Sequence, residues 1–123
     1  MKWLAVLAML AASPVLAQKT EAKLDCKFSG KEFIYDCAIR LTRAGEPLSG
    51  AQITVGADMP SMPMAHQVRP VKAQPTRTPG EYRARLDLEM PGEWAVKLRI
   101  SGPVRDQLVL HYDFTESGTA PRR

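Results

Sequence analysis

The chain has 123 residues and a formal net charge of +4, and it is 45% hydrophobic and 24% charged. This length suits one domain rather than two, and this composition favours a packed core over a disordered chain. Only two His and two Cys are present, so a zinc site of four cysteines is excluded, and an enzyme built on several converging His or Cys residues has little material.

Residues 1–17 have the layout of a secretory signal peptide. Lys2 supplies a positive charge, and the run from Trp3 to Ala17 is apolar and ends in small residues suited to cleavage. This run has 15 residues, short of the roughly 20 that cross a bilayer, which favours cleavage over a retained anchor. We therefore expect a periplasmic protein that begins at Gln18. Export removes nucleic acid as a partner, and the basic residues are spread rather than clustered.

Alternation of apolar and polar residues runs through the mature chain and predicts strands with one buried face. In chain order the apolar positions fall within Leu24–Phe28, Phe33–Leu41, Ala51–Val55, Tyr82–Met90, Trp94–Ile100 and Leu108–Phe114. Turns rich in Gly and Pro separate these runs, and no window has a helical period. We therefore expect an all-β fold, an immunoglobulin-like antiparallel β-sandwich of about seven strands over residues 18–115, followed by a flexible tail at 116–123.

The segment Pro91-Gly92-Glu93 separates two of these runs and predicts a hairpin. A three-residue loop sets Met90 opposite Trp94 and Asp87 opposite Lys97, so both apolar faces agree in register. Met90 and Trp94 are then expected in the core.

Cys26 and Cys37 each fall on the apolar face of a run, on the two sides of a turn at Ser29-Gly30. In an exported protein, two inward-facing cysteines on neighbouring strands are expected to form a disulfide. A redox pair or thiolate metal ligands are the alternatives. Neither a Cys-x-x-Cys spacing nor an adjacent His is present to activate a thiol, which favours the structural disulfide.

The segment from Met59 to His66 is the most biased in composition. It holds Met59, Met62, Met64 and His66 within eight residues. Thioethers are soft, neutral donors, so this set favours Cu(I), with Ag(I) as its chemical mimic. On an extended path Met62, Met64 and His66 share one face, whereas a polyproline-like path brings Met59 close to Met62.

Two other interpretations of these side chains stay open. Met packs readily into irregular cores, so the Met run can equally be the buried face of a strand or a lid. His111 lies on the outward face of the last predicted strand and is a further candidate ligand, although a lone outward His is more often simply solvated.

Residues from Gly45 to Ile100 resemble the YtkA-like and FixH-like domains of exported or membrane-anchored bacterial proteins. The matching segments are Gly45–Ala51, Met59–His66, Pro79–Tyr82 and Leu88–Trp94. The resemblance implies an immunoglobulin-like sandwich with its core at about 45–114 and a link to copper supply or tolerance, because FixH-like proteins serve assembly of copper-containing oxidases. The ligands that it implies are Met62, Met64 and His66, with Met59 as a further candidate.

Two departures from the FixH-like pattern bear on function. The chain lacks a full-length membrane anchor, and it carries Cys26 and Cys37. These features favour a soluble periplasmic binder of copper, a chaperone, buffer or tolerance factor, whose partners are the metal ion and a periplasmic or inner-membrane copper-handling protein. The alternative is a non-metal accessory domain that contacts a partner protein through the Met/Pro-rich segment or a strand edge. We do not expect an enzyme, since neither a Ser/His/Asp set nor a phosphate-binding Gly loop is present.

Overall fold

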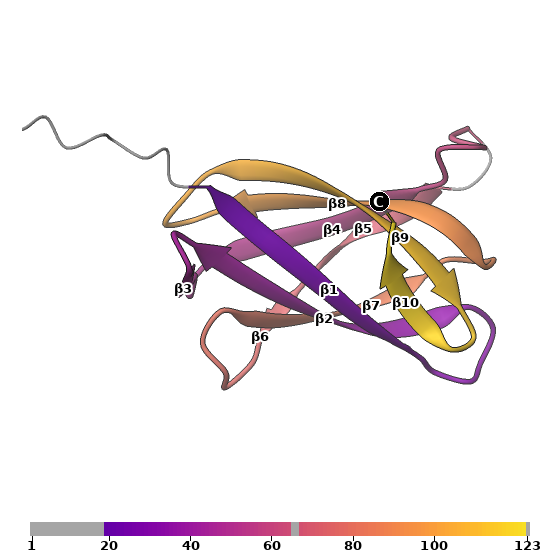
Figure 1. Ribbon diagram of the computed structural model, residues 1–123, viewed down its shortest axis with the longest axis horizontal. Helices are drawn as coiled ribbons and strands as arrows, with labels where there is room; N and C mark the ends of the chain where they lie inside the picture. Colours follow the sequence, from indigo (N-terminus) through magenta and orange to yellow (C-terminus); the bar gives the residue numbers. More distant parts are fainter. Residues whose placement is uncertain (1–18, 65–66, 123) are drawn as a thin grey trace, which may run out of the picture.

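The computed structural model describes residues 19–64 and 67–122, which form ten β-strands and no helix. The strands are β1 (Thr20–Phe28), β2 (Ile34–Arg43), β3 (Glu46–Pro47), β4 (Gln52–Asp58), β5 (Gln67–Lys72), β6 (Gln74–Pro75), β7 (Glu81–Asp87), β8 (Gly92–Ser101), β9 (Asp106–Thr115) and β10 (Gly118–Pro121) (Figure 1). No helix in this part of the chain is long and apolar enough to cross a membrane. The predicted signal peptide at 1–17 lies outside the described residues.

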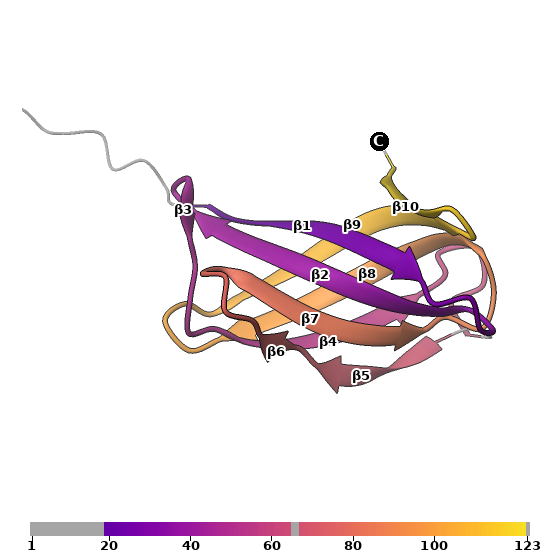
Figure 2. The same ribbon diagram turned by 90° about the horizontal axis from the view of Figure 1, so that it is seen from below.

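The strands form two five-stranded antiparallel sheets. The first sheet has the order β1-β2-β7-β6, with β3 added to β2, and the second has the order β10-β9-β8-β4-β5. Figure 2 shows the two sheets stacked face to face, with their strands crossing at an angle. The predicted all-β sandwich is therefore confirmed. Four strands are not predicted by the alternation: the two-residue strands β3 and β6, and the strands β5 and β10. All four are too short or too polar to show a clear alternation of apolar and polar residues.

The core is the layer of side chains between the sheets. Strand β7 alternates strictly, with Tyr82, Ala84 and Leu86 buried and the residues between them exposed. Trp94 and Phe114 from the second sheet and Tyr35 from the first are fully buried. The rings of Tyr35 and Phe114 pack edge to face with their centroids 5.1 Å apart. The long strands β1, β2, β4 and β7 thus contribute alternate residues to a single core, as the alternation predicts.

The predicted hairpin at residues 91–93 is wrong. Strand β7 belongs to the first sheet and β8 to the second, so Asp87 lies opposite Ile34, not Lys97. The Lys97 ammonium is instead 2.7 Å from the Asp58 carboxylate. Alternation shows which face of a strand is buried but not which sheet holds it, because both sheets of a sandwich bury their inner faces.

The connection from β7 to β8 is a crossover between the sheets. Leu88 is fully buried, Glu89 has a φ of 65°, and the Met90 N–H donates to the Leu88 carbonyl at 2.7 Å. Met90 is partly buried against the core, and its carbonyl accepts a hydrogen bond from the Trp94 indole at 3.2 Å. Met90 and Trp94 therefore pack in the core region, but by a tight turn rather than as a cross-strand pair.

The predicted flexible tail at 116–123 is also wrong, because residues 118–121 form β10, which pairs with the second half of β9. Few of its side chains can be buried, so backbone and polar bonds hold it in place. The Thr119 hydroxyl accepts the Cys26 N–H at 3.0 Å, and the Arg122 N–H donates to the His111 carbonyl at 2.9 Å. Hydrogen bonds of this kind leave no hydrophobic signature in the sequence.

The predicted disulfide is confirmed. Cys26 and Cys37 lie directly opposite each other on β1 and β2, with an S–S bond of 2.05 Å and Cα atoms 3.9 Å apart. Both side chains are buried. The bridge joins two neighbouring strands of one sheet, so it secures β1, an edge strand, to the rest of the first sheet.

Removing the disulfide should destabilise the fold without changing it. We expect the variant Cys26→Ala/Cys37→Ala to lose about 3 kcal/mol of unfolding free energy, because a loop of this size is no longer closed in the unfolded chain. Urea unfolding followed by circular dichroism measures the loss. Adding reductant should lower the wild-type stability by a similar amount and leave the variant unchanged; equal stability of both proteins in oxidising buffer would contradict a structural role.

Tyr35 links the two sheets and should make the fold sensitive to alkali. Its hydroxyl donates to the Thr115 carbonyl at 2.7 Å, and burial raises the pKa of Tyr35, with a smaller increase from the Glu116 carboxylate. A raised pKa in the folded state means that this group stabilises the fold below pH 10 and that the contribution is lost as the pH rises through the folded value.

We therefore expect Tyr35→Phe to lose about 1 kcal/mol at neutral pH, the usual net value of one hydrogen bond. The variant should also lose less stability than the wild type between pH 9 and pH 11, measured by urea unfolding at each pH. An alkaline decline as steep in the variant as in the wild type would show that Tyr35 is not the group responsible.

Candidate functional site

The whole Met- and His-rich segment forms the loop of one hairpin. Strands β4 and β5 pair antiparallel, and their last pair, Asp58 with Gln67, closes an eight-residue loop at residues 59–66, which we call the methionine loop. It projects from one end of the sandwich (Figure 1). Two of its residues, Ala65 and the predicted ligand His66, lie outside the residues that the structure describes.

The described part of the loop is turned rather than extended. The Met62 N–H donates to the Met59 carbonyl at 3.0 Å, which closes a turn with Pro60 in its second position, where the fixed φ of proline fits. The Gln67 side chain donates to the Pro63 carbonyl at 2.8 Å. Met62 and Met64 therefore do not share the face of a straight strand, and the extended arrangement does not apply to residues 59–64.

Met59 lies beneath the loop, in the core. Its side chain is only 4% exposed, and its Cε atom is so close to Gly92 that a Cβ there would lie 3.1 Å from it. Burial of one such side chain contributes roughly 1.5–3 kcal/mol. Met59 thus anchors the start of the loop against the beginning of β8.

Met62 and Met64 are exposed. Met62 is 39% exposed and Met64 is 91% exposed, and only Val109 joins them as an exposed large hydrophobic side chain among the described residues. A side chain exposed to that degree has almost no packing contacts, so the core interpretation does not describe Met64. The loop therefore consists of one buried thioether at its base and two thioethers accessible to solvent.

The charges near the loop are already paired. Asp58, at the base of the loop, is bound to Lys97 across the sheet. Among residues 19–64 and 67–122, no three or more His, Cys, Asp or Glu side chains come together in a way that could hold a metal ion. Within the described part of the methionine loop, the donors accessible to a metal are the sulfurs of Met62 and Met64.

His111 lies in register with the base of the loop but two strands away. It is opposite Ala95, which is opposite Asp58, so roughly 10 Å separates His111 from the end of β4. Its Nδ1 is 3.8 Å from the Glu93 carboxylate, which also binds Arg122 at 3.0 Å. His111 thus belongs to a charged cluster on the outer face of the second sheet, and the structure does not bring it to the methionine loop.

The fold and the loop define a small all-β sandwich domain that carries an exposed, methionine-rich hairpin loop. A family model described as YtkA-like matches residues 28–99, more than half of the chain. The chain therefore belongs to the YtkA-like family. The match covers all of β4 to β7 and includes the methionine loop. Comparison with curated proteins and with solved structures finds no significant match.

The different exposures of the three loop methionines should produce different rates of oxidation. With hydrogen peroxide, we expect Met64 to become the sulfoxide first, Met62 next, and Met59 about tenfold or more slowly, because access to the sulfur controls the reaction. Fragment-ion mass spectrometry of the peptide that contains all three resolves them. In denaturant the three oxidation rates should become similar. If Met59 is oxidised as fast as Met64 in the folded protein, the burial of Met59 at the base of the loop is wrong.

Proposed function

We propose that this chain is an exported, periplasmic protein that binds Cu(I) through the methionine loop and acts as a copper chaperone, buffer or tolerance factor. The proposed ligands are Met62, Met64 and His66. The observation that carries the proposal is the 91% exposure of Met64 beside a second exposed thioether. No catalytic activity is part of this proposal.

Exposure of two methionine side chains forgoes stabilisation of the fold, which favours a function for their sulfur atoms. Each exposed apolar side chain forgoes the roughly 1.5–3 kcal/mol that burial would contribute. Met59, three residues before Met62, obtains this stabilisation by packing against Gly92. A chain that buries one Met of the loop and presents the next two to solvent has the arrangement that a metal arriving from outside requires.

The type of donor supports copper rather than a hard cation. Thioethers bind Mg²⁺ or Ca²⁺ poorly and Cu(I) well, and the carboxylate at the base of the loop, Asp58, is engaged by Lys97. Because thioethers carry no proton, binding should depend on pH only through His66. Two sulfurs and one imidazole leave room for a further ligand, which suits transfer to a copper-handling partner by exchange of ligands.

Met59 enters the proposal as an anchor. Its sulfur lies in the core, so binding metal there would require the base of the loop to open. By holding the start of the loop, Met59 limits the space that Met62 and Met64 can explore and reduces the entropy lost when a metal orders them.

The second candidate function is a protein contact without metal. The same exposure of Met62 and Met64, next to Pro60 and Pro63, makes a small apolar surface at the tip of the loop. Flexible Met side chains adapt to many partners. This candidate needs the shape and apolarity of the side chains but not their sulfur atoms, and that difference separates the two functions.

A titration of the mature protein with Ag(I) or Cu(I) against a competing chelator tests the proposal. We expect Met62→Leu/Met64→Leu to bind about 10- to 100-fold more weakly, since the substitution keeps volume and apolarity but removes both sulfurs. Met90→Leu, the same change outside the loop, should bind as the wild type does.

The same variants identify the alternative. If the wild type and the Met62→Leu/Met64→Leu variant bind the metal equally weakly, copper binding by the loop is wrong. If His66→Gln lowers the affinity for the metal and Met62→Leu/Met64→Leu does not, the metal is not bound by the loop thioethers. A protein contact made through apolar surface would survive the Leu variant and would be lost in Met62→Ser/Met64→Ser.

A further inference from the structure

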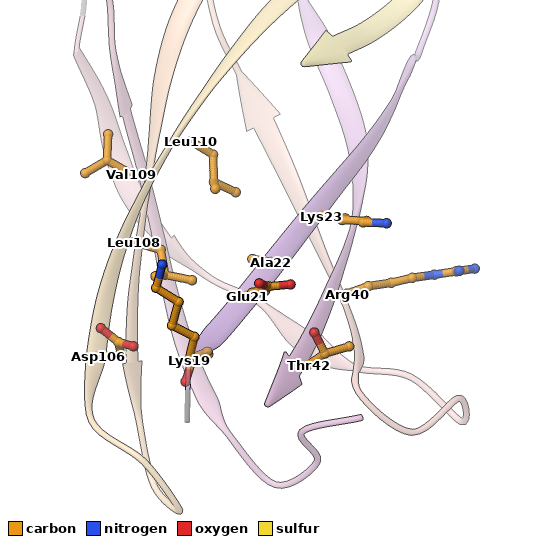
Figure 3. A pocket seen from close by; sticks show the side chains of 11 residues that line it. Lys19, Glu21, Ala22, Lys23, Arg40, Thr42, Asp106, Leu108, Val109 and Leu110 are labelled. Carbon is orange, nitrogen blue, oxygen red and sulfur yellow. The ribbon is translucent and has the colours of Figure 1, made fainter. Parts of the chain in front are cut away.

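Two unpaired strand edges face each other at the opposite end of the sandwich from the methionine loop. Strand β10 covers only the second half of β9, from Tyr112 to Thr115, and β1 is the edge strand of the first sheet. Between β1 and the first half of β9 lies a groove of about 840 Å³. Leu108 and Leu110 project into it from β9 toward β1, and Ala22 lies across from them (Figure 3).

Backbone directions on β9 follow from one hydrogen bond. The His111 carbonyl accepts from Arg122, on the side away from β8, so the odd-numbered residues of β9 direct their N–H and C=O groups toward the open edge. The N–H and C=O groups of Val109 therefore point toward the groove. Its side chain is 48% exposed and lies on the outer face of the second sheet. Among the described residues its N–H has no hydrogen-bond partner.

Strand β1 shows the matching arrangement. The Leu24 N–H donates to the Tyr112 hydroxyl and the Cys26 N–H to the Thr119 hydroxyl, so the even-numbered residues direct their backbone groups away from β2. The second half of β1 is thus capped by groups from β9 and β10. Ala22, in the first half, has the same direction, and within the described residues its N–H is unpaired.

Several other edge strands carry features that oppose further pairing. Pro47, Pro70, Pro75 and Pro121 stand in β3, β5, β6 and β10, and the pairing of β5 with β4 is interrupted by a bulge. Proline and bulges are the usual means of preventing a strand from adding to an edge. The first halves of β1 and β9 contain neither proline nor a bulge, so an added strand is permitted in the groove.

Only an extended, single segment satisfies both edges. A folded sheet offers one free edge and cannot enter between two strands, so a second copy of this domain does not fit the groove as a whole. The groove walls of Ala22, Leu108 and Leu110 favour an aliphatic residue at every second position. The groove is lined by three cations, Lys19, Lys23 and Arg40, and by two carboxylates, Glu21 and Asp106. Lys19 extends toward β9, whereas Lys23 and Arg40 point away from it (Figure 3). Acidic residues between the aliphatic ones complement this excess of positive charge.

We propose that this groove binds an extended segment of a partner protein, with alternating aliphatic and acidic residues, by addition of a β-strand between β9 and β1. The segment continues the line of β10 along β9. Since the methionine loop leaves the sandwich at its other end, a bound segment leaves Met62 and Met64 uncovered (Figure 1). The proposal does not depend on copper binding.

A defined peptide tests it. The test peptide has eight residues of alternating valine and glutamate and is blocked at both ends. Its control is the same peptide N-methylated at every second residue, which removes the N–H donors along one edge. In NMR spectra of the mature protein, the first peptide should shift and protect the amides of Ala22 and Val109. By fluorescence anisotropy the methylated peptide should bind about tenfold or more weakly, since one row of backbone hydrogen bonds is lost. A lysine version should also bind more weakly.

Variants of the edge provide the matched controls. Val109→Pro removes the N–H that faces the groove and should weaken binding about tenfold or more, whereas Val109→Thr keeps it and should bind normally. If Val109→Pro does not fold, Lys19→Glu/Lys23→Glu at two exposed positions should weaken binding instead. Ag(I) titration of these variants should match the wild type, which separates this proposal from the copper site.

Results of three kinds would overturn strand addition. The first is equal binding of the plain and the methylated peptides. The second is amide shifts that avoid Ala22 and Val109 at saturating peptide, or absence of binding at millimolar concentration. The third is slow hydrogen exchange at Val109 in the free protein, which would show that the edge is already occupied by self-association.

Discussion

The layer of aromatic side chains between the sheets is the constraint on which the rest of the structure depends. A buried tyrosine costs free energy unless its hydroxyl finds a partner, so each buried hydroxyl fixes a direction as well as a distance. Tyr35 reaches from the first sheet to Thr115 in the second, and Tyr112 reaches from the second to Leu24 in the first. Tyr82 binds the Leu48 carbonyl and the Ala51 N–H, just before β4. The hydroxyls of Tyr35 and Tyr112 thus fix the relative position of the two sheets, which hydrophobic contact alone leaves free to slide, and the Tyr82 hydroxyl fixes the segment that leads into β4.

Both candidate surfaces follow from this fixed packing. At one end, Met59 extends the core beyond β4 and packs against Gly92, so the methionine loop begins from a rigid base while Met62 and Met64 remain outside. At the other end, the Tyr112 hydroxyl caps only the second half of β1. Where that capping stops, the two edges separate and the groove opens. The same tyrosine that closes one half of the sandwich therefore determines where the other half is open.

Local chemistry was sufficient to predict the strands and the disulfide. The alternation of Tyr82, Ala84 and Leu86 indicates a buried face without any knowledge of the partner strand, and Cys26 and Cys37 flank a single turn. Sheet membership was not predictable in this way, because Leu86 and Leu98 would pack equally well as neighbours in one sheet or as partners across the core. Strand β10 escaped notice for a related reason: hydrogen bonds, rather than apolar side chains, hold it to β9 and β1.

The candidate site shows the same division between composition and geometry. The density of Met between residues 59 and 64 marks the segment, and the alternation of Ile53, Val55 and Ala57 continues only to Met59, which sets this buried residue apart from the exposed Met64. The alternation ends there because Met59 begins a turn with Pro60 in its second position, so the chain leaves the core within one residue after Met59. A one-residue shift in the register of β4 would turn Met59 from the core to the outer face. The register of β4 against β8, set by the buried pairs Val55 with Leu98 and Ile53 with Ile100, therefore determines which sulfurs of the loop reach solvent.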